Sequence, residues 1–429
     1  MARLTRRQLL IGGAALAATP SLSRAGTGPK KLMIITAMGG WDPTFVFVPS
    51  LSNGEVDAPD IDEDPNNPED REATRTYGDV EINVNDYKRP SASAFFERYM
   101  SKSLIVNGIW TGAIAHTPAQ IRILTGMTGD TSPDFGVIAG SELGRNLPLG
   151  TVDMSGRGRA GHLASTMAKV GHRGQLLALV DPMGSAFQTP DESSFSPSGY
   201  VPSAANDAAI RNYLRGRVDR VESRFKDRLG HNEAMLADWR SSWDRAELLE
   251  GEAGDLLATL ELGVTPTPLQ ASLVGIDMLE RGLCSTIMID TAPDWDTHAG
   301  NVQQHGYYEA MFIGLTATVA ELDARGMLDD TLVCVLSEMI RTPRITTDGG
   351  KGHWPHATAL LVGGGVSGGR VIGGYDSLLQ SLPMDLNTGL VDPSAELLTY
   401  DRFVGGILEF LDVDPQPWLP GVSPLRALR

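Results

Sequence analysis

The sequence predicts an α/β protein built on a mostly parallel, doubly wound β-sheet, and two observations carry this prediction. Short apolar runs rich in β-branched residues recur between Gly, Pro and Asp, as is typical of strands buried on both faces. Helical stretches separate the runs, for example 301–324, which precedes the helix stop Gly326. Strand, helix, strand is the crossover unit of a parallel sheet. We expect strands at 32–37, 104–109, 176–180, 286–290, 332–336 and 358–362.

The N-terminal segment has the form of an export signal. Arg6-Arg7 and the apolar run 9–18 are typical of a twin-arginine leader, and Ala25 offers a small residue for cleavage. The run is about half as long as the ~20 residues of a membrane-spanning helix, which disfavours the alternative of an uncleaved anchor. We therefore predict a signal peptide at 1–25, the twin-arginine export machinery as a partner, and a mature protein in the periplasm or outside the cell. No later stretch is long and apolar enough to predict a transmembrane segment.

The mature chain is strongly acidic. The full chain has a formal net charge of −17, and loss of the leader removes four arginines, which gives −21. Such a surface argues against nucleic acid and anionic membranes as partners. The chain has only two cysteines, Cys284 and Cys334, each within an apolar run. We expect buried free thiols, with a disulfide between neighbouring strands as the less favoured alternative.

The mature residues, 26–429, are predicted to form one large domain with two insertions. The first, 53–90, opens with carboxylates among prolines and asparagines. A calcium-binding EF-hand loop would need Gly and Glu where Pro65 and Arg71 stand, so a solvated acidic loop is expected. The second, 204–262, is charged and helical in pattern, and we expect a helical insertion over the sheet.

Carboxylates and imidazoles follow four of the predicted strands. Ligands of open α/β sheets gather at the carboxyl ends of strands, so these side chains are candidates for one site. A single carboxylate after a glycine turn is more often a cap, but five of the eight histidines lie in or beside these loops. Oxygen and nitrogen donors without thiolates suit one or two divalent cations, such as Zn, Mn, Mg or Ca. The candidates are Asp42, His116, Asp294, Asp296, His298, Glu338 and His353.

Five short motifs stand out at 39–42 (Gly-Gly-Trp-Asp), 295–298 (Trp-Asp-Thr-His), 337–343, 353–355 and the glycine-rich 361–373. Together with the leader they resemble the motif set of domain of unknown function 1501, a bacterial exported family related to alkaline phosphatases and sulfatases. The resemblance covers most of the mature chain. It implies an alkaline-phosphatase-like, three-layer α/β/α fold, whose members mostly hydrolyse phosphate or sulfate esters with divalent metals.

The resemblance also implies metal ligands. Asp42 matches the first-strand Asp ligand, and Asp296 with His298 matches the Asp-Thr-His motif. Asp294 stands at the usual Asp-to-His spacing as well, so the choice between Asp294 and Asp296 stays open. His353 matches the last His of the set.

Several positions depart from the family pattern. Glu338 stands where the superfamily has Asp followed by His, but Met339 follows it here. Gly352 replaces the Asp before the last His, and Ile340 replaces the Gly before Arg-Thr-Pro. Glu338 is nevertheless the ligand that this alignment implies at the end of the fifth strand.

Residues 116–126 resemble the sulfatase pattern Cys-x-Pro-Ser-Arg-x-x-x-x-Thr-Gly. His116 stands at the nucleophile position and Gln120 at the supporting Arg, so formylglycine chemistry is excluded. Thr117 is a candidate hydroxyl nucleophile activated by metal, whereas His116 is a candidate nucleophile or metal ligand. In an extended stretch before Pro118 these two side chains would point to opposite faces. The alternative is a turn and helix start retained in a degenerate relative.

The sequence thus favours a metal-dependent hydrolase of phosphate or related esters. The expected ligands are Asp42, Asp296, His298, Glu338 and His353, and Thr117 or His116 would act at phosphorus while Arg341 steadies the anion. The rival hypothesis is a non-catalytic exported scaffold that binds a partner or a polysaccharide. A redox enzyme is less favoured, because the chain has no cysteine cluster and no dinucleotide-binding fingerprint.

Overall fold

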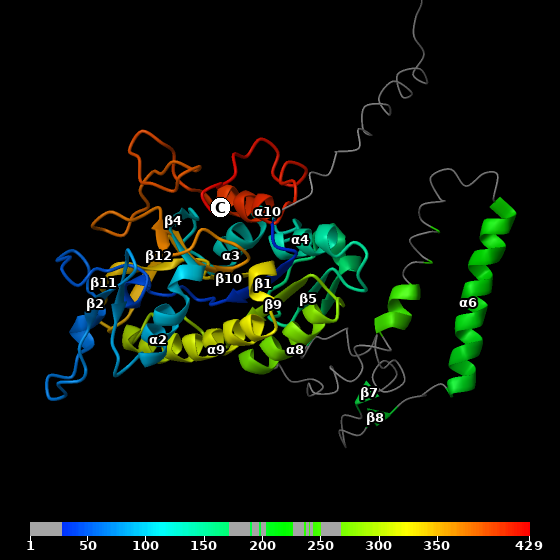
Figure 1. Cartoon of the computed structure of the whole chain (residues 1–429), viewed down its shortest axis with the longest axis horizontal. Helices are drawn as coiled ribbons and strands as arrows, with labels where there is room; N and C mark the ends of the chain where they lie inside the picture. Colours follow the sequence, from blue (N-terminus) through cyan, green and yellow to red (C-terminus); the bar gives the residue numbers. More distant parts are fainter. Residues whose placement is uncertain are drawn as a thin grey trace, which may run out of the picture.

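A central eight-stranded sheet organises the chain (Figure 1). The computed structural model describes residues 28–170, 203–225, 243–249 and 267–429, together with 189–190, 197–198, 236 and 240. The strands of the sheet are β1 (Lys31–Thr36), β4 (Ser103–Trp110), β5 (Thr151–Asp153), β6 (Met167–Lys169), β9 (Thr286–Asp290), β10 (Thr331–Leu336), β13 (His356–Gly363) and β14 (Arg370–Ile372). Their order is β14-β4-β13-β10-β1-β9-β5-β6.

The sheet is parallel except at β13, which runs antiparallel to both of its neighbours, β10 and β4. Strand β1 lies at the centre, where Ile34 pairs with Cys334 of β10 on one side and with Met288 of β9 on the other. The carboxyl ends of β1, β9 and β10 therefore meet at one edge of the sheet, and this edge carries most of the candidate ligands.

Alternate side chains of the strands enter two hydrophobic cores, one on each face of the sheet. In β1, Met33 and Ile35 pack in one core, whereas Leu32 and Ile34 pack in the other. All four are buried, which explains why the strand reads as a continuous apolar run.

Helices close both cores (Figure 1). The core of Met33 is covered by α2 (Pro90–Tyr99), α8 (Pro268–Glu280) and α9 (Gln304–Ala324). The opposite core is covered by α3 (His116–Thr125), α4 (Phe135–Leu143) and α10 (Tyr400–Phe410). The layers are helix, sheet and helix, which confirms the predicted three-layer α/β class with a mostly parallel sheet.

Local sequence signals fix several helix ends. Thr267 begins α8 with a reciprocal capping box to Gln270, and Asp134 caps α4 by accepting from the backbone N–H of Val137. The long helix α9 ends just before Gly326, whose φ of 66° is left-handed and suits glycine.

The expected strands agree with β1, β4, β9, β10 and β13, and the expected helix at 301–324 corresponds to the 3-10 turn η5 (Asn301–Gln303) followed by α9. The expected strand at 176–180 and the leader at 1–25 lie outside the described residues. The antiparallel direction of β13 has no local sequence signal, because a buried strand is apolar throughout in either direction.

The acidic segment 53–90 contains more structure than a solvated loop. It holds the 3-10 turn η2 (Pro59–Asp62) and a hairpin of β2 (Ala73–Tyr77) and β3 (Val80–Val84). Asp70 is buried, and there its carboxylate accepts from Asn85 and forms an ion pair with Lys88 at 2.9 Å. Of the segment 204–262, the structure describes chiefly the helix α6 (Ala204–Phe225).

The remaining elements are short. They are the 3-10 turns η1 (Pro43–Phe45), η3 (Met100–Lys102), η4 (Gly161–Thr166) and η6 (Leu328–Asp330), the hairpin of β11 (Ile340–Ile345) and β12 (Lys351–Trp354), and the pair β7 (Thr189–Pro190) and β8 (Pro197–Ser198).

Cys284 and Cys334 are buried free thiols, as expected, and they belong to opposite cores. Burial raises the pKa of both thiols, which keeps them unreactive. Within the described part of the chain, no helix has the length and apolarity to span a membrane.

Candidate metal centre

Four candidate side chains converge beyond the carboxyl edge of the sheet: His116, Asp296, His298 and His353. Asp296 and His298 lie in the loop after β9, His116 is the first residue of α3, and His353 lies in β12. One potential ligand atom from each lies within 4.8 Å of every other. Residues from three separate parts of the chain therefore form one compact set of three imidazoles and a carboxylate.

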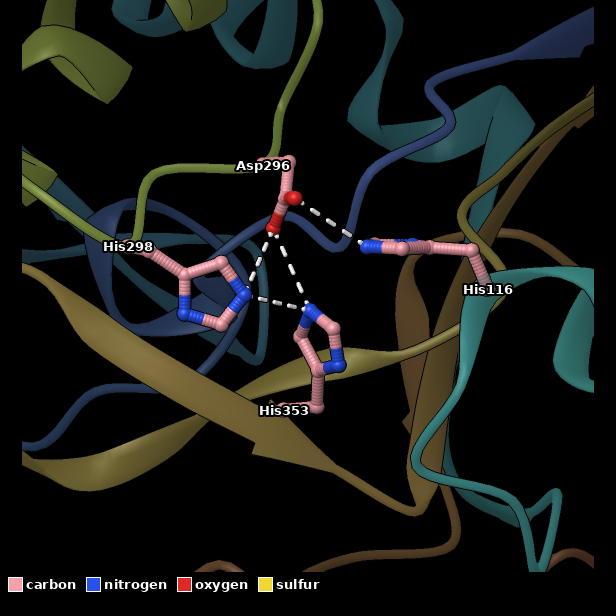
Figure 2. Close-up of side chains that lie close together, drawn as sticks. All are labelled: His116, Asp296, His298 and His353. Atoms are coloured by element: carbon pink, nitrogen blue, oxygen red, sulfur yellow. Dashed lines mark hydrogen bonds and ion pairs between the residues drawn. The ribbon is translucent and has the colours of Figure 1, made fainter.

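The carboxylate of Asp296 is the common partner of the three imidazoles (Figure 2). Its Oδ1 lies 3.1 Å from Nε2 of His298 and 3.2 Å from Nε2 of His353. Its Oδ2 lies 3.2 Å from Nε2 of His116. The side chains are 16% to 51% exposed, so solvent or a substrate can reach the cluster.

Two of the imidazoles are oriented by hydrogen bonds at the nitrogen that points away from the cluster. Nδ1 of His353 lies 2.6 Å from the carbonyl oxygen of Ile114, and a carbonyl can only accept, so this nitrogen carries the proton. Nδ1 of His116 lies 2.7 Å from Oε1 of Glu338. Each bond leaves Nε2 as the nitrogen that faces the cluster, which is the ring orientation that a metal-bound histidine needs.

Glu338 lies behind His116 and not among the four converging groups. Its carboxylate is fully buried and accepts from the backbone N–H of Gly39 at 3.0 and 3.1 Å and from the Ser337 hydroxyl at 3.2 Å. Gln120 adds a longer bond of 3.4 Å. The hydrogen bond to Glu338 is the main reason that the pKa of His116 is raised, with burial opposing it. Glu338 therefore orients His116 and lies outside the cluster, so the ligand role that the resemblance implied for it stays a prediction.

Arg341 fixes the position of Asp296 in the cluster. Its guanidinium is fully buried and donates to Oδ1 of Asp296 at 2.6 Å. It also donates to the backbone carbonyls of Gly39, Gly40, Trp295 and Lys351. These bonds already occupy most of its donors, so the expected contact with a bound anion stays untested.

The charge of Asp296 follows from these contacts. Burial alone would raise its pKa, but hydrogen bonds from Arg341 and His353 outweigh burial and lower the pKa to about 2. The carboxylate is therefore ionised and ready to bind a cation. Burial lowers the pKa of His298, which favours the neutral imidazole that a metal requires.

Asp294 and Asp42 lie outside the cluster. Oδ1 of Asp294 accepts from the backbone N–H of Asp296, so the structure brings Asp296 and not Asp294 to the imidazoles. Asp42 is fully buried after β1 and forms an ion pair with Lys351 at 2.8 Å. Nothing in the sequence around Lys351 predicts this ion pair.

Thr117 is the second residue of α3 and is exposed. The stretch before Pro118 is helical and not extended, so the expected placement of His116 and Thr117 on opposite faces does not apply. Thr117 instead lies in the first turn of α3, one residue after the ligand candidate His116.

The arrangement fits a divalent metal ion. Nε2 of His298 lies only 2.8 Å from Nε2 of His353, and two imidazole nitrogens this close repel unless a proton or a cation lies between them. Nε2 of His116 is buried, and among the described residues it has no hydrogen-bond partner of good geometry. A cation at the centre of the cluster would satisfy these nitrogens and Asp296 together.

The model of the family described as "Protein of unknown function (DUF1501)" matches residues 29–386. The chain belongs to this family. The match confirms the resemblance inferred from the short motifs, and it includes all four residues of the cluster. A search of curated proteins finds no relative of this DUF1501 member.

Several solved structures are similar to the DUF1501 chain at low identity. A protein in the alkaline phosphatase superfamily from Vibrio parahaemolyticus is 9% identical, with 98% of this chain and 78% of that chain covered and a TM-score of 0.38. The phosphonate monoester hydrolase of Agrobacterium radiobacter is 12% identical, with 92% and 78% covered and a TM-score of 0.32. A mutant of TAB5 alkaline phosphatase with Mg bound is 9% identical, with 90% and 99% covered and a TM-score of 0.37.

Proposed function

We propose that this DUF1501 protein is an exported, metal-dependent hydrolase of phosphate or related esters. One observation carries the proposal: three imidazole nitrogens and an ionised carboxylate converge within 4.8 Å at the carboxyl edge of the sheet. The cluster is partly exposed, and buried groups orient its members, which is how catalytic metal sites are built.

The donor set favours zinc or a similar transition ion. Three nitrogen donors and one oxygen donor suit Zn²⁺, and Mn²⁺ is the next choice, whereas Mg²⁺ and Ca²⁺ prefer sites made of oxygen alone. A divalent ion held here would polarise an ester oxygen and lower the pKa of a nearby hydroxyl or water.

The chain's own residues would divide the remaining tasks. Glu338 holds the Nδ1 proton of His116, and Arg341 keeps Asp296 ionised and fixed. Thr117 offers a hydroxyl beside His116 at the N-terminus of α3, where backbone N–H groups favour a negative charge. We therefore assign the ligand role to His116 and keep Thr117 as the candidate nucleophile.

The test combines metal content with turnover. Protein purified from the periplasm should contain about one zinc or manganese ion per chain by elemental analysis. The loaded protein should hydrolyse an activated phosphate monoester, phosphate diester or sulfate ester. Full metal content without turnover on any of the three would favour the exported scaffold that binds a partner or a polysaccharide.

A further inference from the structure

Lys351 is fully buried although its side chain carries an ammonium group. Its Nζ lies 2.8 Å from Oδ2 of Asp42, and that side chain is also fully buried. A lone charge in a protein interior is very costly, so each group depends on the other for neutralisation.

The carboxylate of Asp42 accepts three hydrogen bonds besides its ion pair with Lys351. Its Oδ1 accepts from the backbone N–H of Thr44 at 3.1 Å and from the Thr44 hydroxyl at 2.7 Å. Its Oδ2 accepts from Nδ2 of Asn301 at 2.8 Å and also faces Lys351. A carboxylate offers about four acceptor positions, so a metal ion at Asp42 would have to displace the Lys351 ammonium.

The ion pair is tied to the metal cluster through the backbone of Lys351. Its carbonyl oxygen accepts from Nη1 of Arg341 at 3.0 Å, and the same guanidinium holds Asp296 at 2.6 Å. Its N–H donates to the carbonyl of Thr297, between the two candidate ligands of that loop. The position next to the cluster where Asp42 would recruit a second cation is therefore taken by a cation of the chain itself.

We propose that Lys351 supplies the second positive charge of this centre, so that the centre binds one divalent ion and Asp42 is not a ligand. This inference rests on the proposed function only in assigning the ion to His116, Asp296, His298 and His353. It contradicts the ligand role that the family resemblance implied for Asp42, because the buried Lys351 occupies that carboxylate.

A double-mutant cycle on Asp42 and Lys351 tests the inference. The variants are Asp42→Asn, Lys351→Met and the double variant, with Asp294→Asn as a control that removes a carboxylate near the cluster. Each is dialysed against excess Zn²⁺ and then metal-free buffer, and ions per chain and the melting temperature are measured. Wild type and Asp42→Asn should both retain one ion. Each single variant should melt several degrees lower, and the double variant should recover a large part of the loss, since it buries no unpaired charge.

Two ions in wild type, or loss of an ion in Asp42→Asn but not in Asp294→Asn, would overturn the inference. Simply additive losses of melting temperature would also overturn it, because the two side chains would then not be coupled. His298→Ala separates this failure from that of the proposed function. If wild type binds an ion that is lost in His298→Ala, the proposed metal centre stands, whatever the result for the Asp42 variants. A wild type without any ion overturns both the proposed function and the inference about Lys351.

Discussion

Oε1 of Glu338 lies 2.7 Å from Nδ1 of His116, across 222 positions of sequence. Glu338 follows β10, and His116 begins α3. The buried carboxylate accepts the Nδ1 proton, and Nε2 on the other side of the ring faces Oδ2 of Asp296 at 3.2 Å. A carboxylate behind a histidine in this way raises the basicity of the ligand and fixes its ring.

Glu338→Gln should weaken metal binding without abolishing it. The amide oxygen can still accept from Nδ1 of His116, but the negative charge is lost. We expect about a 10–100-fold higher dissociation constant for zinc, the range typical of residues behind a metal ligand. Competition with a chromophoric chelator measures this change. An unchanged constant would show that Glu338 does not act on the metal site.

His298→Ala should remove most of the bound metal and lower the melting temperature by a few degrees or more. A metal that joins loops from several strands stabilises only the folded chain, so its loss appears as lost stability. Elemental analysis and thermal unfolding with and without a chelator measure both effects. Asp294→Asn serves as the control, because Asp294 lies outside the cluster, and equal metal loss in both variants would argue against the ligand assignment.

Thr117→Ala should abolish hydrolysis of an activated phosphate ester while the metal content stays at the wild-type value. Thr117→Ser, which keeps the hydroxyl, should recover a measurable part of the activity. His116→Ala should lower metal content and activity together, because His116 is a proposed ligand. If Thr117→Ala keeps full turnover, the nucleophile is not Thr117.

Replacing Arg6 and Arg7 by Lys should leave the full-length precursor in the cytoplasm. The twin-arginine pair before the apolar run 9–18 is the motive for this prediction. Cell fractionation with immunoblotting measures it, and Arg3→Lys is the matched control outside the pair. Undiminished export of the Arg6 and Arg7 variant would refute the assignment of the leader.

Stability should fall as the pH drops below about 6.5, in part because of His305. Burial, and then the charge of Arg89, lower the pKa of His305 to about 2, and the imidazole contacts the Arg89 guanidinium through Nδ1. In the unfolded chain His305 binds a proton near pH 6.5, whereas in the folded chain it stays neutral. This residue therefore lowers the free energy of unfolding by about 2 kcal/mol at pH 5.

His305→Asn keeps an acceptor near Arg89 and cannot take up the proton. Its stability should therefore fall less between pH 7.5 and pH 5 than that of wild type, as measured by urea unfolding at each pH. If the stability of His305→Asn falls as steeply with pH as that of wild type, His305 does not cause the loss.

The sequence by itself determined the class of fold and the family. The apolar runs at β1, β4, β9 and β10 have a local cause, since strands buried on both faces must be apolar throughout. It also placed Asp296 and His298 after the fourth predicted strand and His353 in the segment after the fifth, and ligands of open α/β sheets gather at the carboxyl ends of strands. The direction of β13 was left open, because an apolar run carries no signal for it.

Only the tertiary structure decided which polar residues converge in the cluster and which neutralise one another. Asp42 and Glu338 have the same local signature as Asp296, a carboxylate just after a strand. They differ in their partners, because Lys351 comes to Asp42 and His116 to Glu338 from distant segments. The role of a buried carboxylate depends on which charge or proton lies within about 3 Å, and chain folding sets that distance.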